Sequence, residues 1–167
     1  MKQTIAKKSK KWLKTLKRNG FREPFQIIID NSFIKAANQQ KIGQYSLNEM
    51  LRNEPKLYMT KCTYEKHKAH LIEKDFSGYC EIIKCGHEKP QTNCVYQFIK
   101  ENNPHHYILA TNNHHYISEL KESKHIPVLT IFRSQLTINC NKLDCTVGLH
   151  EMYATKSELR HLKRMFG

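Results

Sequence analysis

One short segment near the middle of the chain concentrates side chains that bind metals. Its cysteines and histidine follow the spacing C-x4-C-x-H-x6-C and are Cys80, Cys85, His87 and Cys94. Three thiolates and one imidazole are a common tetrahedral ligand set of structural zinc sites. Because the protein would supply all four ligands, the sequence predicts one structural zinc ion and not a catalytic one. The alternative interpretation is a set of unrelated buried cysteines.

Other groups of the same residue types carry a weaker metal signal. Cys140, Cys145 and His150 repeat a five-residue spacing but have no fourth ligand nearby. The histidine pairs at 105–106 and 114–115 flank predicted strands, where paired histidines are typical of polar loops. Cys62 stands apart from these groups and is expected to pack in the core, as free cysteines commonly do.

Asp30 is the candidate residue for acid or metal chemistry. It follows the apolar run 26–29, whose β-branched residues indicate a buried parallel strand. Ligand crevices of parallel sheets lie beyond the carboxyl ends of the strands, and the later run 107–111 ends at Asn112 and Asn113. Several carboxylates at this edge would hold Mg²⁺ or Mn²⁺ for phosphodiester cleavage. Asparagines are poorer ligands, so Asp30 is alternatively a helix N-cap.

An enzyme hypothesis stays open on these residues. A metal-dependent endoribonuclease would use Asp30 with Glu65 and Asp75, the carboxylates that the predicted elements place nearest. Lys66 follows Glu65 directly, and a lysine ammonium lowers the affinity of a site for cations. The chain has one other aspartate, Asp144. The scarcity of aspartates favours a protein that binds a polyanion without cleaving it.

The N-terminus predicts a basic amphipathic helix. Residues 1–18 contain no acid, and Ile5, Trp12, Leu13 and Leu16 fall on one helical face among the lysines. We predict that residues 1–22 form an arm that contacts RNA. Its candidate RNA-binding residues are Lys7, Lys8, Lys10, Lys11, Lys14, Lys17, Arg18 and Arg22. A partner groove, a membrane surface, duplex DNA or plain solvation, with the apolar stripe docked on the chain's own domain, would suit the same pattern.

Strand and helix patterns alternate after the arm. Strands are expected at 26–30, 56–60, 107–111 and 127–132, with an edge strand at 135–140. Helices are expected at 32–40, 46–52, 62–74, 94–101 and 157–165, the first with Ser32 as a possible cap. This alternation predicts an α/β fold with right-handed crossovers and a mostly parallel sheet covered on both faces. Residues 23–150 would form the domain, including the loop 80–94, and 151–167 a basic C-terminal helix.

Length and charge limit the remaining function classes. The chain has 167 residues, a length typical of one domain. Its formal charge of +13 favours a polyanion as a partner. No apolar run approaches the roughly 20 residues of a membrane span, and the N-terminus lacks the apolar core of a secretory signal. We therefore expect a reducing compartment, in which the cysteines are thiols or metal ligands.

Four stretches resemble a eukaryotic family of PIN-domain rRNA-processing proteins. They are FREPFQIIIDN (21–31), the Cys80–Cys94 block, NPHHYILAT (103–111) and HIPVLTI (125–131). The resemblance implies a PIN-like three-layer α/β/α fold with an inserted zinc loop, a nuclear and nucleolar location, and assembly of the small-subunit processome that processes pre-18S rRNA. It also implies that the partners are pre-rRNA, a small nucleolar RNA and other processome proteins, with no membrane and no small-molecule substrate.

The same resemblance implies a degenerate nuclease centre. Asp30 matches the first acid of the PIN active site, whereas Lys66, Asn113 and His115 stand where the family pattern has its other acids. The leading hypothesis is therefore a non-catalytic, RNA-binding assembly factor of 40S ribosome biogenesis. The alternative is a metal-dependent PIN endoribonuclease that acts on pre-rRNA through Asp30.

Overall fold

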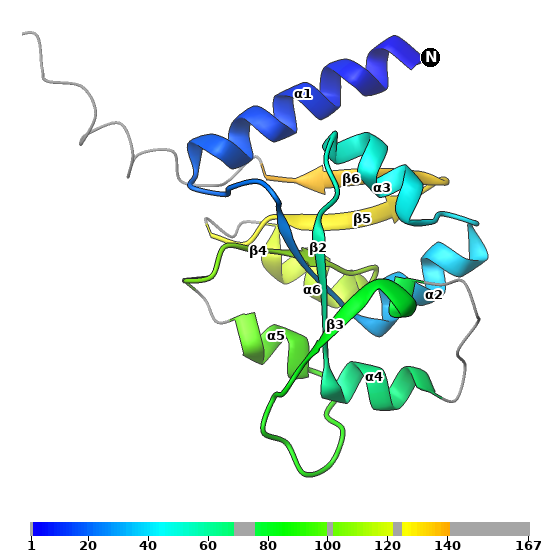
Figure 1. Ribbon diagram of the computed structural model, residues 1–167, viewed down its shortest axis with the longest axis vertical. Helices are drawn as coiled ribbons and strands as arrows, with labels where there is room; N and C mark the ends of the chain where they lie inside the picture. The colour runs from blue at the N-terminus through cyan, green and yellow to red at the C-terminus, as the bar shows by residue number, and fades with distance from the viewer. Residues whose placement is uncertain (1, 69–75, 100–101, 122–124, 141–167) are drawn as a thin grey trace, which may run out of the picture.

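A six-stranded sheet organises the chain in this computed structural model, which describes residues 2–68, 76–99, 102–121 and 125–140. The strand order is β3-β2-β1-β4-β5-β6 (Figure 1). The strands are β1 (Gln26–Ile29), β2 (Lys56–Thr60), β3 (Cys80–Ile83), β4 (Tyr107–Ala110), β5 (Val128–Phe132) and β6 (Gln135–Asn139). Strands β1 to β5 pair in parallel and β6 pairs antiparallel to β5. This topology confirms the predicted mostly parallel sheet with an edge strand at its end.

Strand β1 lies at the centre of the sheet because it is apolar on both of its faces. Ile27, Ile28 and Ile29 are fully buried, as expected for a parallel strand covered on both sides. Ile28 pairs with Tyr58 of β2 on one side and Leu109 of β4 on the other. The prediction of a buried parallel strand over 26–29 is confirmed.

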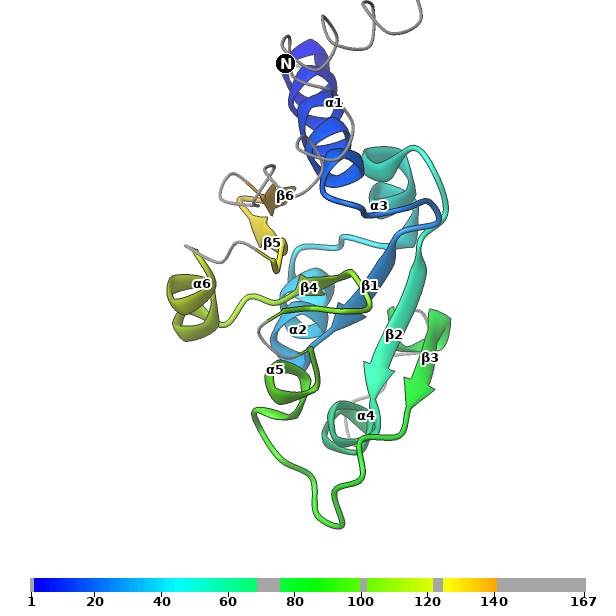
Figure 2. The same cartoon turned by 90° about the vertical axis from the view of Figure 1, so that its left-hand side faces the viewer.

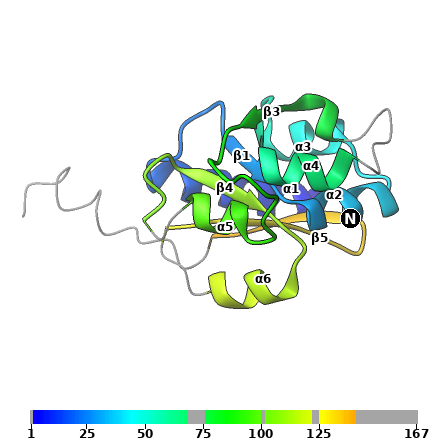
Figure 3. The ribbon, with the colours of Figure 1, turned by 90° about the horizontal axis from the view of Figure 1, so that it is seen from below.

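Helices cover both faces of the sheet. They are α1 (Lys2–Arg18), α2 (Asn31–Gln39), α3 (Gln44–Leu51), α4 (Lys61–His67), α5 (Cys94–Ile99) and α6 (His114–Leu120), with a 3₁₀ turn η2 at Phe76–Tyr79. Leu16 of α1, Phe33 of α2 and Leu47 of α3 belong to the apolar cluster on one face. Val95 of α5 and Leu120 of α6 belong to the cluster on the other. Figure 3 shows α6 on the opposite side of β5 from α1, α2 and α3.

Helix α1 packs on the domain along its apolar stripe. Leu13 and Leu16 are buried in the core, and the Ser9 hydroxyl donates a 2.9 Å hydrogen bond to the carbonyl of Met50 in α3. Figure 2 shows α1 lying over α3 and β6. The basic side chains Lys8, Lys10, Lys11, Lys14, Lys17 and Arg18 are exposed. The amphipathic helix predicted for the N-terminus is confirmed, and it is docked on the chain's own body.

Several predicted boundaries differ from the structure. Helix α2 is capped by Asp30 and not by Ser32, because the Asp30 carboxylate accepts the backbone N–H of Phe33. Strand β3 and helix α6 were not predicted, and α6 places His114 and His115 in a helix instead of a loop. Helices α4 and α5 end at His67 and Ile99 within the described residues.

Some predictions fall on residues outside the described ranges. They concern Asp75, Asp144, Cys145, His150 and the basic helix 157–165. Within the described ranges, no helix combines the length and the apolar content that a bilayer-spanning segment needs.

Candidate metal centre and the carboxyl edge of the sheet

Four metal-ligating side chains converge beyond the carboxyl ends of β2 and β3. Cys62, Cys85, His87 and Cys94 present ligand atoms that all lie within 4.8 Å of one another. The Sγ atom of Cys62 is 3.4 Å from Sγ of Cys85 and 3.3 Å from Nδ1 of His87. Three sulfur atoms and one imidazole nitrogen at these separations can bind a metal ion.

The parallel pairing of β2 with β3 brings these residues together. Thr60 at the end of β2 pairs with Ile83 at the end of β3, so the segments that follow both strands leave the same edge. Cys62 lies in the first turn of α4, directly after β2. Cys85 and His87 lie in the loop after β3, and Cys94 begins α5. Between Cys85 and His87, Gly86 has a φ of +73°, a left-handed conformation that glycine adopts without strain.

Cys80 is not part of this cluster, which corrects the predicted ligand set. It begins β3 and pairs with Leu57, three residues before the Thr60–Ile83 pair at the carboxyl edge. Three residues of strand span about 10 Å. The Cys80 thiol donates a 3.1 Å hydrogen bond to the Phe76 carbonyl instead. Cys62, predicted as a core residue, is buried but takes the fourth position of the cluster.

The thiols of the cluster have pKa values that shift in opposite directions. Burial raises the pKa of Cys85, but hydrogen bonds, chiefly from the backbone and side chain of Cys62, lower it by more than burial raises it. The net pKa of Cys85 is about 6. Burial raises the pKa of Cys94 to about 12, with the Cys85 and Cys62 side chains adding to the rise against a hydrogen bond from Thr60. One thiolate thus forms easily, while closely packed sulfurs resist further charge. A cation at their centre would remove that resistance.

The Asp30 carboxylate is saturated by neutral donors. It is 9% exposed and accepts hydrogen bonds from Phe33 N–H (2.8 Å), the Ser32 hydroxyl (2.7 Å) and the Thr111 hydroxyl (2.5 Å). Burial raises the pKa of Asp30, and these hydrogen bonds oppose the rise. Asp30 belongs to no cluster of three or more potential ligands among the described residues. The structure therefore gives Asp30 the helix-capping role that was its alternative interpretation.

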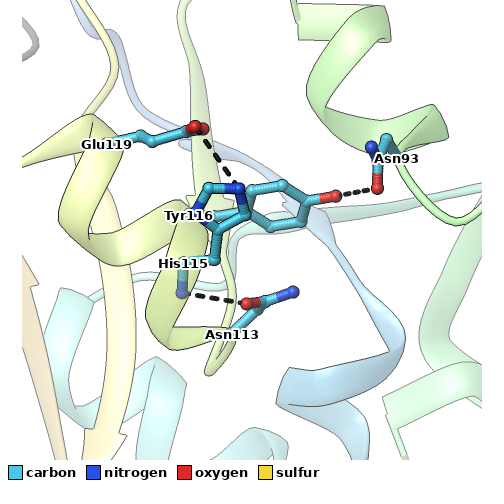
Figure 4. Close-up of polar contacts among 5 residues, drawn as sticks. All are labelled: Asn93, Asn113, His115, Tyr116 and Glu119. Atoms are coloured by element: carbon cyan, nitrogen blue, oxygen red, sulfur yellow. Dashed lines mark hydrogen bonds and ion pairs between the residues drawn. The ribbon is translucent and has the colours of Figure 1, made fainter.

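The other positions matched to PIN acids serve local structure. Lys66 donates to the Thr92 hydroxyl at 2.8 Å, and Glu65 is exposed on α4. Asn113 caps α6 by accepting the backbone N–H of His115 at 3.0 Å (Figure 4). The His115 side chain is exposed and lies 3.4 Å from Glu119, one turn further along α6.

Asn112 connects the end of β4 to β5, and Tyr116 connects α6 to α5. Asn112 donates to the Ile131 carbonyl at 2.8 Å and accepts the Ile131 N–H at 3.0 Å, so its amide continues the pairing of β4 with β5. The Tyr116 hydroxyl donates to Asn93 (Figure 4). The Tyr116 ring stacks on Tyr96 of α5. Sequence reasoning missed Tyr116, because α6 itself was not predicted.

Comparison with known proteins agrees with this architecture. The model of the Fcf1 family matches residues 49–140, more than half of the chain. The chain belongs to the Fcf1 family. The matched region contains all four residues of the thiol–imidazole cluster and Asn113, and Asp30 lies before it. The family resemblance predicted from the sequence is thereby confirmed.

Two similar proteins extend the comparison. The rRNA-processing protein utp23 of Schizosaccharomyces pombe is 29% identical over 145 residues, which cover 80% of this chain and 56% of that protein. This Fcf1-family chain thus spans little more than half the length of that relative. The solved structure of the PIN domain endonuclease Utp24 superposes with a TM-score of 0.59 at 20% identity, covering 71% of this chain and 93% of that one. This likeness confirms the PIN-like α/β fold.

We expect Asp30→Asn to change how stability depends on pH. Asparagine also caps helices, so the variant should retain the Phe33 hydrogen bond while losing a titratable group. The folded-state pKa of Asp30 is raised above its ordinary value of 3.8, so the folded chain takes up the proton first as pH falls. As the pH falls from about 7 to about 4, the free energy of unfolding of the wild type should therefore rise relative to that of the variant. Urea denaturation across this range measures the difference, and a constant difference would contradict the burial effect.

Proposed function

We propose that this chain is an rRNA-processing assembly factor that binds RNA and does not cleave it. The observation that carries the proposal is an Asp30 carboxylate enclosed by hydroxyl and amide groups, in a member of a family whose relatives include an rRNA-processing protein. We place its work in the small-subunit processome of the nucleolus, with pre-rRNA, a small nucleolar RNA and other processome proteins as partners. The alternative is a metal-dependent endoribonuclease acting through Asp30.

The chemistry of metal-dependent cleavage supports the non-catalytic choice. Metal-assisted phosphodiester cleavage relies on carboxylates that hold one or two ions and align a water. Around Asp30, the nearest groups are the hydroxyls of Ser32 and Thr111, both of which already donate to it. Asn113 uses its side-chain oxygen to cap α6. A divalent cation would have to displace these hydrogen bonds for the sake of one carboxylate.

Cleavage of RNA is the direct test of this choice. We expect the purified chain, supplied with Mg²⁺ or Mn²⁺, to leave single-stranded and structured pre-rRNA fragments intact, because Asp30 belongs to no group of three or more potential metal ligands among the described residues. The measurement is gel electrophoresis of end-labelled RNA beside the Asp30→Asn variant. Manganese-dependent cleavage that this variant abolishes would establish the endoribonuclease instead.

We further propose that Cys62, Cys85, His87 and Cys94 hold one structural zinc ion. Thiolate and imidazole donors suit zinc, and four protein ligands leave no open position for a catalytic water. The ion would join the start of α4, the loop after β3 and the start of α5. Its chemistry when bound is to stabilise the thiolates and fix these segments, so the binding energy contributes to folding.

The two candidate sets of zinc ligands differ in one cysteine, which provides a matched pair of variants. We expect Cys62→Ser to lose stoichiometric zinc and to unfold at a lower temperature, since it removes one of four ligands. Cys80→Ser should retain zinc, because the Cys80 thiol bonds to the Phe76 carbonyl. Elemental analysis and thermal denaturation with and without a chelator give both readouts. Zinc loss in Cys80→Ser with retention in Cys62→Ser would reverse the assignment.

The exposed face of α1 is our proposed RNA contact. Lys8, Lys10, Lys11 and Lys14 are exposed there, while the opposite face of the helix is buried. Arg22 is also exposed, and Lys17 forms a 3.1 Å ion pair with Glu23. Lysines contact phosphates without reading the bases, so affinity should be strong at low salt and weakly sequence-dependent. The RNA-binding set of Lys7, Lys8, Lys10, Lys11, Lys14, Lys17, Arg18 and Arg22 remains a prediction.

Charge substitution tests this contact better than truncation, since removing α1 would also remove Leu13 and Leu16 from the core. We expect the triple change of Lys10, Lys11 and Lys14 to Gln to weaken RNA binding and to flatten the log–log salt slope by about 2. The control changes Lys35, Lys56 and Lys61, which are exposed elsewhere, to Gln with the same loss of charge. Fluorescence anisotropy from low to moderate salt measures both. Equal effects of the two triplets, or preferred binding to anionic vesicles or duplex DNA, would contradict the contact.

A further inference from the structure

The turn between β5 and β6 has a backbone that its sequence does not favour. Arg133 and Ser134 form this two-residue turn, and their φ angles are +48° and +57°. Hairpin turns with two positive φ angles prefer asparagine and glycine, because other residues bring Cβ into close contact with the backbone. A residue held in this conformation is a candidate functional position.

Arg133 and Phe132 expose a flat, positively charged surface at this turn. The Phe132 side chain is 61% exposed, and the Arg133 guanidinium carbon lies 5.0 Å from the centre of its ring. A cation over an aromatic face is a stabilising arrangement that holds both planar groups in place. Both side chains are exposed, so two planar groups and one positive charge are available to a ligand.

Neighbouring elements hold the turn in position. Thr130 and Thr137 form a 2.9 Å hydrogen bond across the hairpin, and Phe132 pairs with Gln135. The Ser134 N–H donates to the side-chain oxygen of Gln40, the C-terminal cap of α2, at 2.5 Å. The hairpin tip is thus fixed to the body of the domain, and ordering it costs little when a ligand binds.

The turn lies at the carboxyl edge of the sheet, beside the network around Asp30. Ile131 exchanges two hydrogen bonds with Asn112, whose backbone N–H donates to the Ser32 hydroxyl. Successive strand residues alternate between faces, so Phe132 lies on the same face as Val128, which packs with α5 and α6. Figure 1 shows the β5–β6 hairpin at the edge of the sheet over which α1 lies.

We propose that Phe132 and Arg133 form a platform on which an unpaired base of single-stranded RNA stacks. This inference rests on the proposed RNA-binding function and names a base contact for it. Phenyl and guanidinium planes are the groups on which unpaired bases stack, and the guanidinium edge also reaches a neighbouring phosphate. The Arg133 guanidinium lies over the Phe132 ring, so this surface carries a positive charge. A positive charge suits a nucleic acid better than an apolar protein surface.

The experiment compares the RNA affinities of variants of the 167-residue chain by fluorescence anisotropy. The probes are an oligouridine of about ten nucleotides and an RNA duplex of equal length. We expect Phe132→Ala to weaken oligouridine binding about tenfold, with an unchanged salt slope, because stacking is uncharged. Phe132→Trp should restore affinity, and Arg133→Ala should both weaken binding and flatten the slope. Duplex affinity should stay constant in Phe132→Ala.

Tyr45→Ala is the matched control, because Tyr45 is 79% exposed but lies on α3. Equal affinities of Phe132→Ala, Tyr45→Ala and the wild type would overturn the platform while leaving the lysine contact intact. Loss of a protein partner from Phe132→Ala with unchanged RNA affinity would also overturn it and assign the turn to a protein interface. Absence of RNA binding by the wild type would overturn the proposed function itself, together with the platform.

Discussion

The parallel pairing of β1 with β2 and β4 is the constraint on which the rest of the structure depends. It sends every segment that follows a parallel strand out at one edge of the sheet. Asp30 leaves from β1, Cys62 from β2 and Asn112 from β4. Residues that are far apart in the sequence are therefore brought to the same edge by strand pairing. The chemistry of the molecule is decided by which side chains happen to occupy these positions.

Two different chemistries occupy that one edge. At the ends of β2 and β3, thiols and an imidazole crowd together. Burial raises the pKa of Cys94, and the neighbouring Cys85 and Cys62 side chains add to the rise. At the ends of β1 and β4, Asp30 accepts hydrogen bonds from hydroxyl and amide donors. Buried polar networks whose members are all paired stiffen a structure. The same edge thus carries a fully paired hydrogen-bond network at one place and a set of potential metal ligands at another.

The positions of most strands could be predicted because the residues of a buried strand are themselves apolar. The isoleucines of β1 and the alternation of β6 were sufficient for that. Strand β3 escaped because it is an exposed edge, with Glu81 and Ile82 both facing solvent. The predicted ligand set was wrong at Cys80 for a different reason. It was chosen by spacing along the chain, whereas the pairing of β2 with β3 brings Cys62 into the cluster. Applied to the end of β2, the carboxyl-edge rule that placed Asp30 would have found Cys62.

Helix α1 combines two roles that sequence patterns treat as alternatives. Its leucines are part of the core, and its lysines are displayed on the opposite face. The described part of the helix is therefore ordered before any RNA arrives, and the entropy of forming it is lost on folding and not on binding. A docked helix also holds its charges at fixed spacing, which favours one direction of approach for a polyanion. Under the proposed RNA contact, the same docking would couple recognition to stability, because a change that loosens Leu16 would displace the lysines of α1 without altering any of them.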